Sequence, residues 1–206
     1  MRRKVGYFIL TCLFWWSEEG GVTALGQSDR LKSFLSHLPQ VEKISSIEIQ
    51  DDWMGLSELG PLGKRYILKP GVQQFTGTAI FTLGAGPRQR AKEEPVSVPN
   101  EVIQSFLSLL SQSPFEKGEY KPNITHTDDY PSRRIEIVSE GGKLILFSTS
   151  QGEFAIPWGA SFEDEHDIVN SKNPGEALIK IQPYLKNEVF KKFEQEVLVQ
   201  TRKTKK

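Results

Sequence analysis

Residues 75–83 read Phe-Thr-Gly-Thr-Ala-Ile-Phe-Thr-Leu, and their side chains alternate at the two-residue period of a β-strand. Phenylalanine, glycine, alanine and leucine occupy the odd-numbered positions, and threonine occupies most of the even-numbered ones. One face of the strand is therefore apolar and the other is polar. This pattern is typical of an antiparallel sheet that covers a hydrophobic core with one face only.

Further strands are predicted on both sides of this segment. Two precede it, at residues 44–50 and 65–69, and the later ones are 134–139, 143–148, 153–158 and 167–170. Gly141-Gly142 and Ser150-Gln151-Gly152 are typical hairpin turns. Between the two groups, residues 84–95 are rich in glycine, proline and charge, and we expect them to form an exposed loop.

Three helices are predicted from apolar faces and capping residues. The first begins at Ser28 and ends at Pro39, and the second begins at Pro99 and ends before Ser113. The third is a long C-terminal helix that starts near Asn173 and runs past Val197. Its apolar residues repeat every three or four positions, and Pro183 is expected to kink it.

The order is three strands and a helix, followed by three strands and a helix. Hairpin-linked strands with few helices predict an α+β fold, a mainly antiparallel sheet with helices packed on one face. The order also allows an internal repeat, with Ile47-Glu48-Ile49 and Ile135-Glu136-Ile137 in similar places.

The first 26 residues have the order of a secretory signal peptide. A basic start at residues 2–4 precedes an apolar run of 12 residues, Val5–Trp16. A membrane-spanning helix needs roughly 20 apolar residues, so this run is too short to cross a bilayer. We expect cleavage after Gly26, a periplasmic or extracellular location, and no transmembrane span in the mature protein. Lipidation of Cys12 is the alternative.

The mature chain is expected to form a single domain, residues 27–200, followed by a basic, solvated tail, residues 201–206. The signal peptide, residues 1–26, holds three of the 26 basic and two of the 26 acidic side chains, so the remaining chain is nearly neutral. Near-neutrality gives no electrostatic basis for binding nucleic acid. Cys12 is the sole cysteine, so the mature protein has no disulfide and no thiolate metal site.

The leading candidate site is the segment 120–131, which contains an imidazole, two carboxylates and two phenols. In an extended chain His126 and Asp128 point the same way, which suits a metal site or a histidine oriented by a carboxylate. Asp129 and Tyr130 adjoin them. The structural alternative is a turn, because Asp, Asn and Thr side chains bond nearby backbone amides.

Secondary candidates are Trp53, Trp158 and His166. The two indole rings can stack on a ligand, although indoles more often belong to the core. His166 lies in the acidic segment 163–167, whose contiguous charges are typical of a solvated loop. The sequence has no phosphate-binding glycine loop and no zinc-binding helix motif, so we predict no cofactor.

A family resemblance rests on the segment 120–131, together with Ser150-Gln151-Gly152 and Pro157-Trp158. These residues resemble uncharacterised exported proteins of cyanobacterial type, over roughly residues 45–190. The resemblance implies a bacterial periplasmic or extracellular location. It implies no activity, because none is assigned to that group.

Two functions are compatible with these features as hypotheses. The first is a non-catalytic binding domain of the cell envelope, whose partner is an envelope protein or polymer. The second is a metal-assisted hydrolase in which His126 is base or ligand and Asp128 and Asp129 hold a cation, with His166 completing the site. The first is preferred, because no residue pattern activates a nucleophile.

Overall fold

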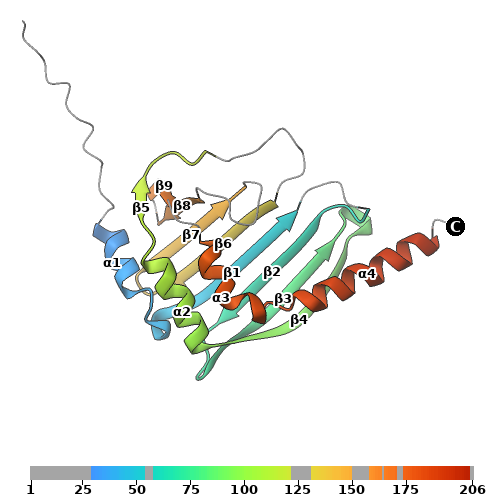
Figure 1. Cartoon of the computed structure of the whole chain (residues 1–206), viewed down its shortest axis with the longest axis horizontal. Coiled ribbons are helices and arrows are strands. Elements are labelled where there is room, and N and C mark those ends of the chain that lie inside the picture. Colours follow the sequence, from blue (N-terminus) through green and yellow to red (C-terminus); the bar gives the residue numbers. More distant parts are fainter. Residues whose placement is uncertain are drawn as a thin grey trace, which may run out of the picture.

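The computed structural model describes residues 29–53, 58–121, 131–149, 158–163, 165–170 and 174–204. These residues form nine strands in a single sheet, with helices across one of its faces (Figure 1). The strands are β1 (Ile44–Trp53), β2 (Leu62–Lys69), β3 (Gln74–Leu83), β4 (Arg90–Pro99), β5 (Phe115–Lys117), β6 (Pro131–Ser139), β7 (Gly142–Ser148), β8 (Trp158–Phe162) and β9 (Glu165–Asn170).

The strand order is β4-β3-β2-β1-β6-β7-β8-β9-β5, and every neighbouring pair is antiparallel. Four consecutive strands, β1 to β4, form one half of the sheet, and β6 to β9 form most of the other half. The two halves meet at the β1–β6 pair. The predicted α+β class with a mainly antiparallel sheet is therefore confirmed. The internal repeat stays a prediction, because strand order alone is no measure of common ancestry.

Helices α1 (Asp29–His37), α2 (Asn100–Ser111) and α3 (Gly175–Ile181) lie across one face of the sheet (Figure 1). Helix α4 (Asn187–Thr204) lies near β2 and β3, because the ring of Phe190 contacts Phe81 at a centroid distance of 5.4 Å. Short 3₁₀ turns complete the helical segments: η1 (Val41–Lys43), η2 (Gly86–Arg88) and η3 (Gln182–Tyr184). In the part of the chain that the structure describes, no helix has both the length and the apolar character needed to cross a membrane.

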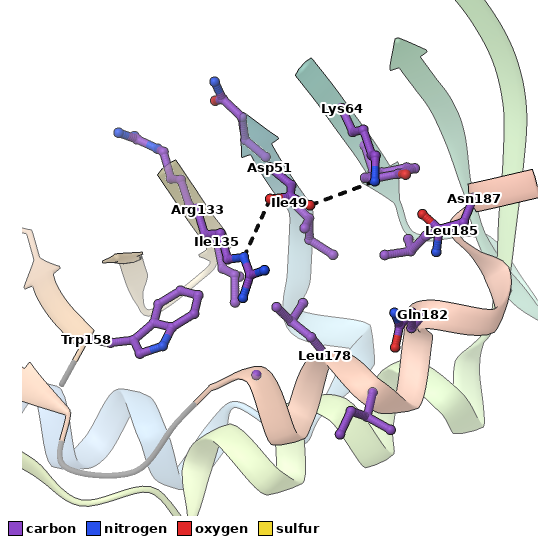
Figure 2. A pocket seen from close by; sticks show the side chains of 15 residues that line it. Ile49, Asp51, Lys64, Arg133, Ile135, Trp158, Leu178, Gln182, Leu185 and Asn187 are labelled. Atoms are coloured by element: carbon purple, nitrogen blue, oxygen red, sulfur yellow. Dashed lines mark ion pairs between the residues drawn. The ribbon is translucent and has the colours of Figure 1, made fainter. Parts of the chain in front are cut away.

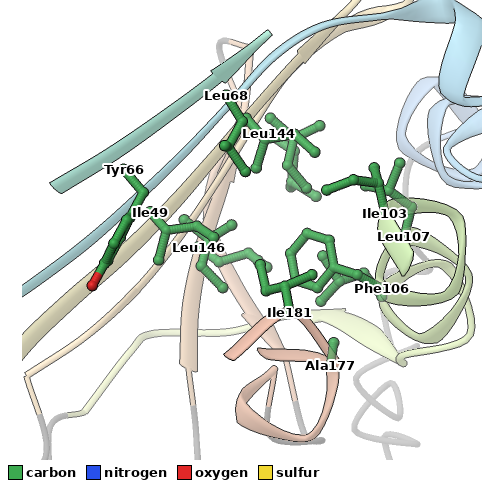
Figure 3. Close-up of a cluster of buried hydrophobic side chains, with 14 of the residues drawn as sticks. Ile49, Tyr66, Leu68, Ile103, Phe106, Leu107, Leu144, Leu146, Ala177 and Ile181 are labelled. Carbon is green, nitrogen blue, oxygen red and sulfur yellow. The ribbon is translucent and has the colours of Figure 1, made fainter. Parts of the chain in front are cut away.

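The core lies between the helices and the inner face of the sheet (Figure 3). Strand register places buried side chains side by side across this face, because residues of one parity point the same way. One such row crosses seven strands: Ala79, Tyr66, Ile49, Ile135, Leu146, Ala160 and Ile168. From the helices, Ile103, Phe106 and Leu107 of α2 and Ala177 and Ile181 of α3 pack against the face. The predicted apolar faces of the first two helices and of β3 are confirmed.

The predicted loop at residues 84–95 is wrong in its second part, where β4 begins at Arg90. This strand pairs with β3 alone and lies at the edge of the sheet. Its charged side chains are tolerated there because an edge strand faces solvent, and Pro95, which lacks a backbone N–H, fits the same position. Only Val96 and Val98 of β4 are buried.

The predicted C-terminal helix is also wrong in part, because the chain forms two helices rather than one kinked helix. Pro183 stands in the 3₁₀ turn between α3 and α4, and Lys186 has a left-handed φ of 53°. Helix α4 continues to Thr204, so it takes in most of the predicted basic tail. The strand predicted at 153–158 is found as β8, which begins at Trp158 and runs to Phe162; residues 153–157 lie outside the described residues.

Candidate binding pocket

A row of charged side chains interrupts the apolar inner face of the sheet. Lys64, Asp51 and Arg133 lie opposite one another on β2, β1 and β6, one step beyond the apolar row that contains Tyr66, Ile49 and Ile135. We call these three residues the charged row. Each of them belongs to the same strand parity as the buried residues, so all three face the helices and not the outer surface.

Asp51 forms ion pairs with both of its neighbours in the charged row (Figure 2). Its Oδ1 lies 3.5 Å from Nε of Arg133, and its Oδ2 lies 3.9 Å from Nζ of Lys64. Nζ of Lys64 also lies 4.7 Å above the centre of the Phe190 ring, a cation–π contact that links α4 to the row. The row therefore carries two positive charges and one negative charge.

A pocket of about 250 Å³ lies between the charged row and the segment formed by α3 and η3 (Figure 2). Its sheet side combines the charged row with the side chains of Ile49, Tyr66 and Ile135. Its helix side is formed by α3 and the turn after it, including Leu178, Ile179, Gln182 and Leu185. The walls are thus mainly aliphatic, and the charges are gathered along one strip of the sheet. Such a lining suits a molecule with an apolar body and a charged end.

Tyr66 contributes an unsatisfied hydroxyl group to this pocket. The residue is only 2% exposed, and its Oη has no hydrogen-bond partner among the described residues. Figure 3 shows its ring at the border of the core, with the oxygen directed away from the apolar cluster. Burial raises the pKa of the Tyr66 phenol, and the negative charge of Asp51 adds to the effect, so the group remains an O–H donor at neutral pH.

Trp158 closes one end of the pocket. The indole is 1% exposed and lies beside the guanidinium of Arg133 (Figure 2). The sequence allows Trp158 to be either a stacking platform or a core residue. It is buried in the core and lines the pocket as well.

The other sequence-predicted residues lie elsewhere. Trp53 ends β1 with 49% of its surface exposed and is not among the pocket residues. His166 belongs to β9. His126, Asp128, Asp129 and Tyr130 fall in residues 122–130, outside the described residues, so the hydrolase hypothesis built on them stays a prediction.

Two neighbouring groups that invite chemistry have structural partners instead. Asp52 lies on the face of β1 opposite to Asp51; burial raises the pKa of its carboxyl group, although Gln50 donates a hydrogen bond to it. The carboxylate of Glu163 accepts a 2.6 Å hydrogen bond from the backbone N–H of Lys143. Within the described ranges, no group of three or more His, Cys, Asp or Glu side chains is placed to hold a metal ion.

Most of the pocket is not predicted by the sequence motifs. Lys64 and Arg133 belong to none of them, and the pair Asp51-Asp52 resembles ordinary turn chemistry. A signal is nevertheless present, because Asp51 continues the alternation of Ile47 and Ile49, and Arg133 precedes Ile135 at the same spacing. A charge at the end of an alternating apolar series is the pattern that marks a polar strip on a buried face.

Comparison with known proteins adds no assignment. No protein-family model matches the sequence, and no curated protein matches it. The function therefore has to be argued from the pocket itself, and the resemblance to exported cyanobacterial proteins stays a prediction.

Proposed function

We propose that this protein is a non-catalytic binding domain that holds a small, partly apolar molecule between the inner face of the sheet and α3. The observation that carries the proposal is the pocket of about 250 Å³ with mainly aliphatic walls. A cavity of about 150 Å³ is known to accept benzene, so this pocket has room for about ten non-hydrogen atoms. The ligand is a small molecule or the end group of a larger envelope component.

The proposal is tested by calorimetric titration of the full-length chain with phenylpropanol, an uncharged molecule of about this size. The blocking variant is Ile179→Trp. Ile179 lines the pocket from α3 and is 48% exposed, so an indole there fills the pocket without entering the core. The matched control is Val199→Trp, since Val199 is 51% exposed on α4 and does not line the pocket.

We expect phenylpropanol to bind the natural chain and the Val199→Trp variant alike, and to lose at least tenfold in affinity for Ile179→Trp. A chain that gives no binding heat, or an Ile179→Trp variant that binds as before, would remove the basis of the proposal. Thermal unfolding of both variants checks that the substitutions leave the fold intact.

We also propose that the protein is exported, with residues 1–26 removed as a signal peptide. The supporting observations are the basic start, the short apolar run and the position of the first described helix, which begins at Asp29, after the expected cleavage site. Amino-terminal sequencing of the protein from the extracytoplasmic fraction is the test. A chain that begins at Gln27 supports export with cleavage, whereas an intact Met1 in cytosolic material contradicts it.

A further inference from the structure

We infer that the ligand of this pocket carries a carboxylate group, which is bound at the charged row by Lys64 and Arg133 and accepts a hydrogen bond from Tyr66. The inference rests on the proposed function and specifies the chemical class of the ligand. Three independent features carry it: the charge balance of the pocket, the unsatisfied hydroxyl of Tyr66 and the size of the pocket.

The first feature is the charge balance. Among the described residues that line the pocket, four are charged: Asp51, Lys64, Arg133 and Arg134. Arg134 donates a 2.6 Å hydrogen bond to Glu136, which is not a lining residue, so its charge is already balanced. The charged row is left with two cations around a single carboxylate. One further negative charge, placed at the row, would bring it to neutrality.

The ion-pair distances point the same way. Strong charge-assisted hydrogen bonds have N–O distances of about 2.7–2.9 Å, and both contacts of Asp51 are longer, at 3.5 Å and 3.9 Å. By contrast, the outer-face pair of Arg65 with Glu48 is bidentate, at 2.7 Å and 2.8 Å. Asp51 therefore holds the two cations near the pocket without closing tightly on either, which leaves both within reach of a second carboxylate.

The second feature is Tyr66. A buried hydroxyl without a partner costs free energy, so such groups are rare unless a ligand or water satisfies them. Its strand neighbours are Ile49 and Ala79, which offer no side-chain acceptor. A carboxylate oxygen at the adjacent charged row is the acceptor that a phenolic O–H would bind most strongly.

The third feature is size. The pocket has room for about ten non-hydrogen atoms, and the row lacks a single negative charge. A phosphate ester carries close to two negative charges at neutral pH and three strongly hydrated oxygens, which the aliphatic walls do not match. A monocarboxylate with an aromatic or short aliphatic body fits both the charge and the walls.

The test compares three probes that share a body and differ at one end: phenylpropionate, phenylpropanol and phenylpropylamine. Each is titrated calorimetrically into the full-length chain and into variants. Lys64→Met removes one cation of the row, and Tyr66→Phe removes the hydroxyl alone. Lys69→Met is the control, because Lys69 is an exposed lysine on the same strand that does not line the pocket.

We expect phenylpropionate to bind at least tenfold more tightly than the alcohol or the amine, since hydrogen bonds to charged groups contribute more than neutral ones. Lys64→Met and Tyr66→Phe should each weaken phenylpropionate binding by about tenfold and change phenylpropanol binding little. Lys69→Met should change neither. Adding salt should weaken binding of phenylpropionate more than that of phenylpropanol.

The outcomes separate the two proposals. If phenylpropanol binds and Ile179→Trp blocks it, but phenylpropionate has no advantage or Lys64→Met has no effect, the pocket is a binding site and the carboxylate inference is wrong. If the amine binds best, the row selects cations through Asp51 and the inference is likewise wrong. If none of the three probes binds, the proposed function itself fails, and the inference falls with it.

Discussion

Two tyrosines of this chain use their hydroxyl groups in opposite ways. Tyr120 Oη accepts a 2.9 Å hydrogen bond from the backbone N–H of Thr149, and its ring lies edge-on to Phe147. Tyr66 Oη, by contrast, is buried and has no hydrogen-bond partner among the described residues. A group that costs stability in the absence of ligand is expected where binding, and not folding, has set the choice of residue.

We therefore predict opposite effects of the same substitution at the two sites. Tyr66→Phe should leave the free energy of unfolding unchanged or raise it by up to about 1 kcal/mol, because it removes an unsatisfied group. Tyr120→Phe should lower that free energy by about 1 kcal/mol, because it removes a formed hydrogen bond. Denaturant unfolding of both variants without ligand is the measurement. Equal losses at the two sites would mean that the Tyr66 hydroxyl is satisfied in solution and has no need of a ligand.

Among the elements, those with a strong local pattern are predicted by the sequence and those that depend on neighbours are not. The alternation of β3 identifies it directly, and α2 is predicted by Pro99 and its apolar face. Strand β4 escapes prediction because its charges at Lys92, Glu93 and Glu94 hide the alternation, and only its place at the sheet edge makes them tolerable. Edge position is a property of the whole sheet, which a local pattern does not contain.

The break between α3 and α4 is larger than the sequence predicts, for a related reason. Pro183 predicts a kink, but the chain turns fully, and Lys186 adopts a left-handed φ of 53°. Such a backbone conformation is unfavourable for a residue with a Cβ atom by roughly 1–2 kcal/mol. The turn is held by the packing of helix α4, whose Phe190 and Phe193 are buried. Packing has overridden local preference here.

This gives a prediction with opposite signs for two lysines. Lys186→Gly should raise the free energy of unfolding by roughly 1 kcal/mol, because glycine adopts the left-handed conformation without strain. Lys191→Gly, an exposed position inside α4, should lower it by about 1 kcal/mol, because glycine disfavours helix interiors. Thermal or denaturant unfolding distinguishes the two. A destabilised Lys186→Gly variant would show that the lysine is not strained at this turn.

At the scale of the whole molecule, the pocket depends on strand register. Lys64, Asp51 and Arg133 come from three separate segments, and they become neighbours only because β1 pairs with both β2 and β6. The sequence predicts that these strands exist but not that they pair across the middle of the sheet. A candidate site drawn from one continuous segment, such as 120–131, is easier to see in a sequence than a site shared among strands.

The same central pair is expected to make the two halves of the sheet unfold together. Strand β1 belongs to the first half and β6 to the second, and β5, which comes after α2 in the chain, pairs with β9 at the far edge of the second half. Ile137 of β6 is fully buried and lies opposite Ile47 of β1. Shortening this side chain therefore weakens the contact between the halves.

We predict that Ile137→Ala lowers the free energy of unfolding by about 2–5 kcal/mol and speeds hydrogen exchange in β2 as much as in β7. The control is Val138→Ala, the next residue on β6, which points to the outer face and is only half-buried, so its effect should be within about 1 kcal/mol. Hydrogen exchange measured by mass spectrometry resolves the two strands. Faster exchange confined to β6 and β7 would show that the halves open separately, and the pocket, which draws side chains from both, would then be lost before the first half unfolds.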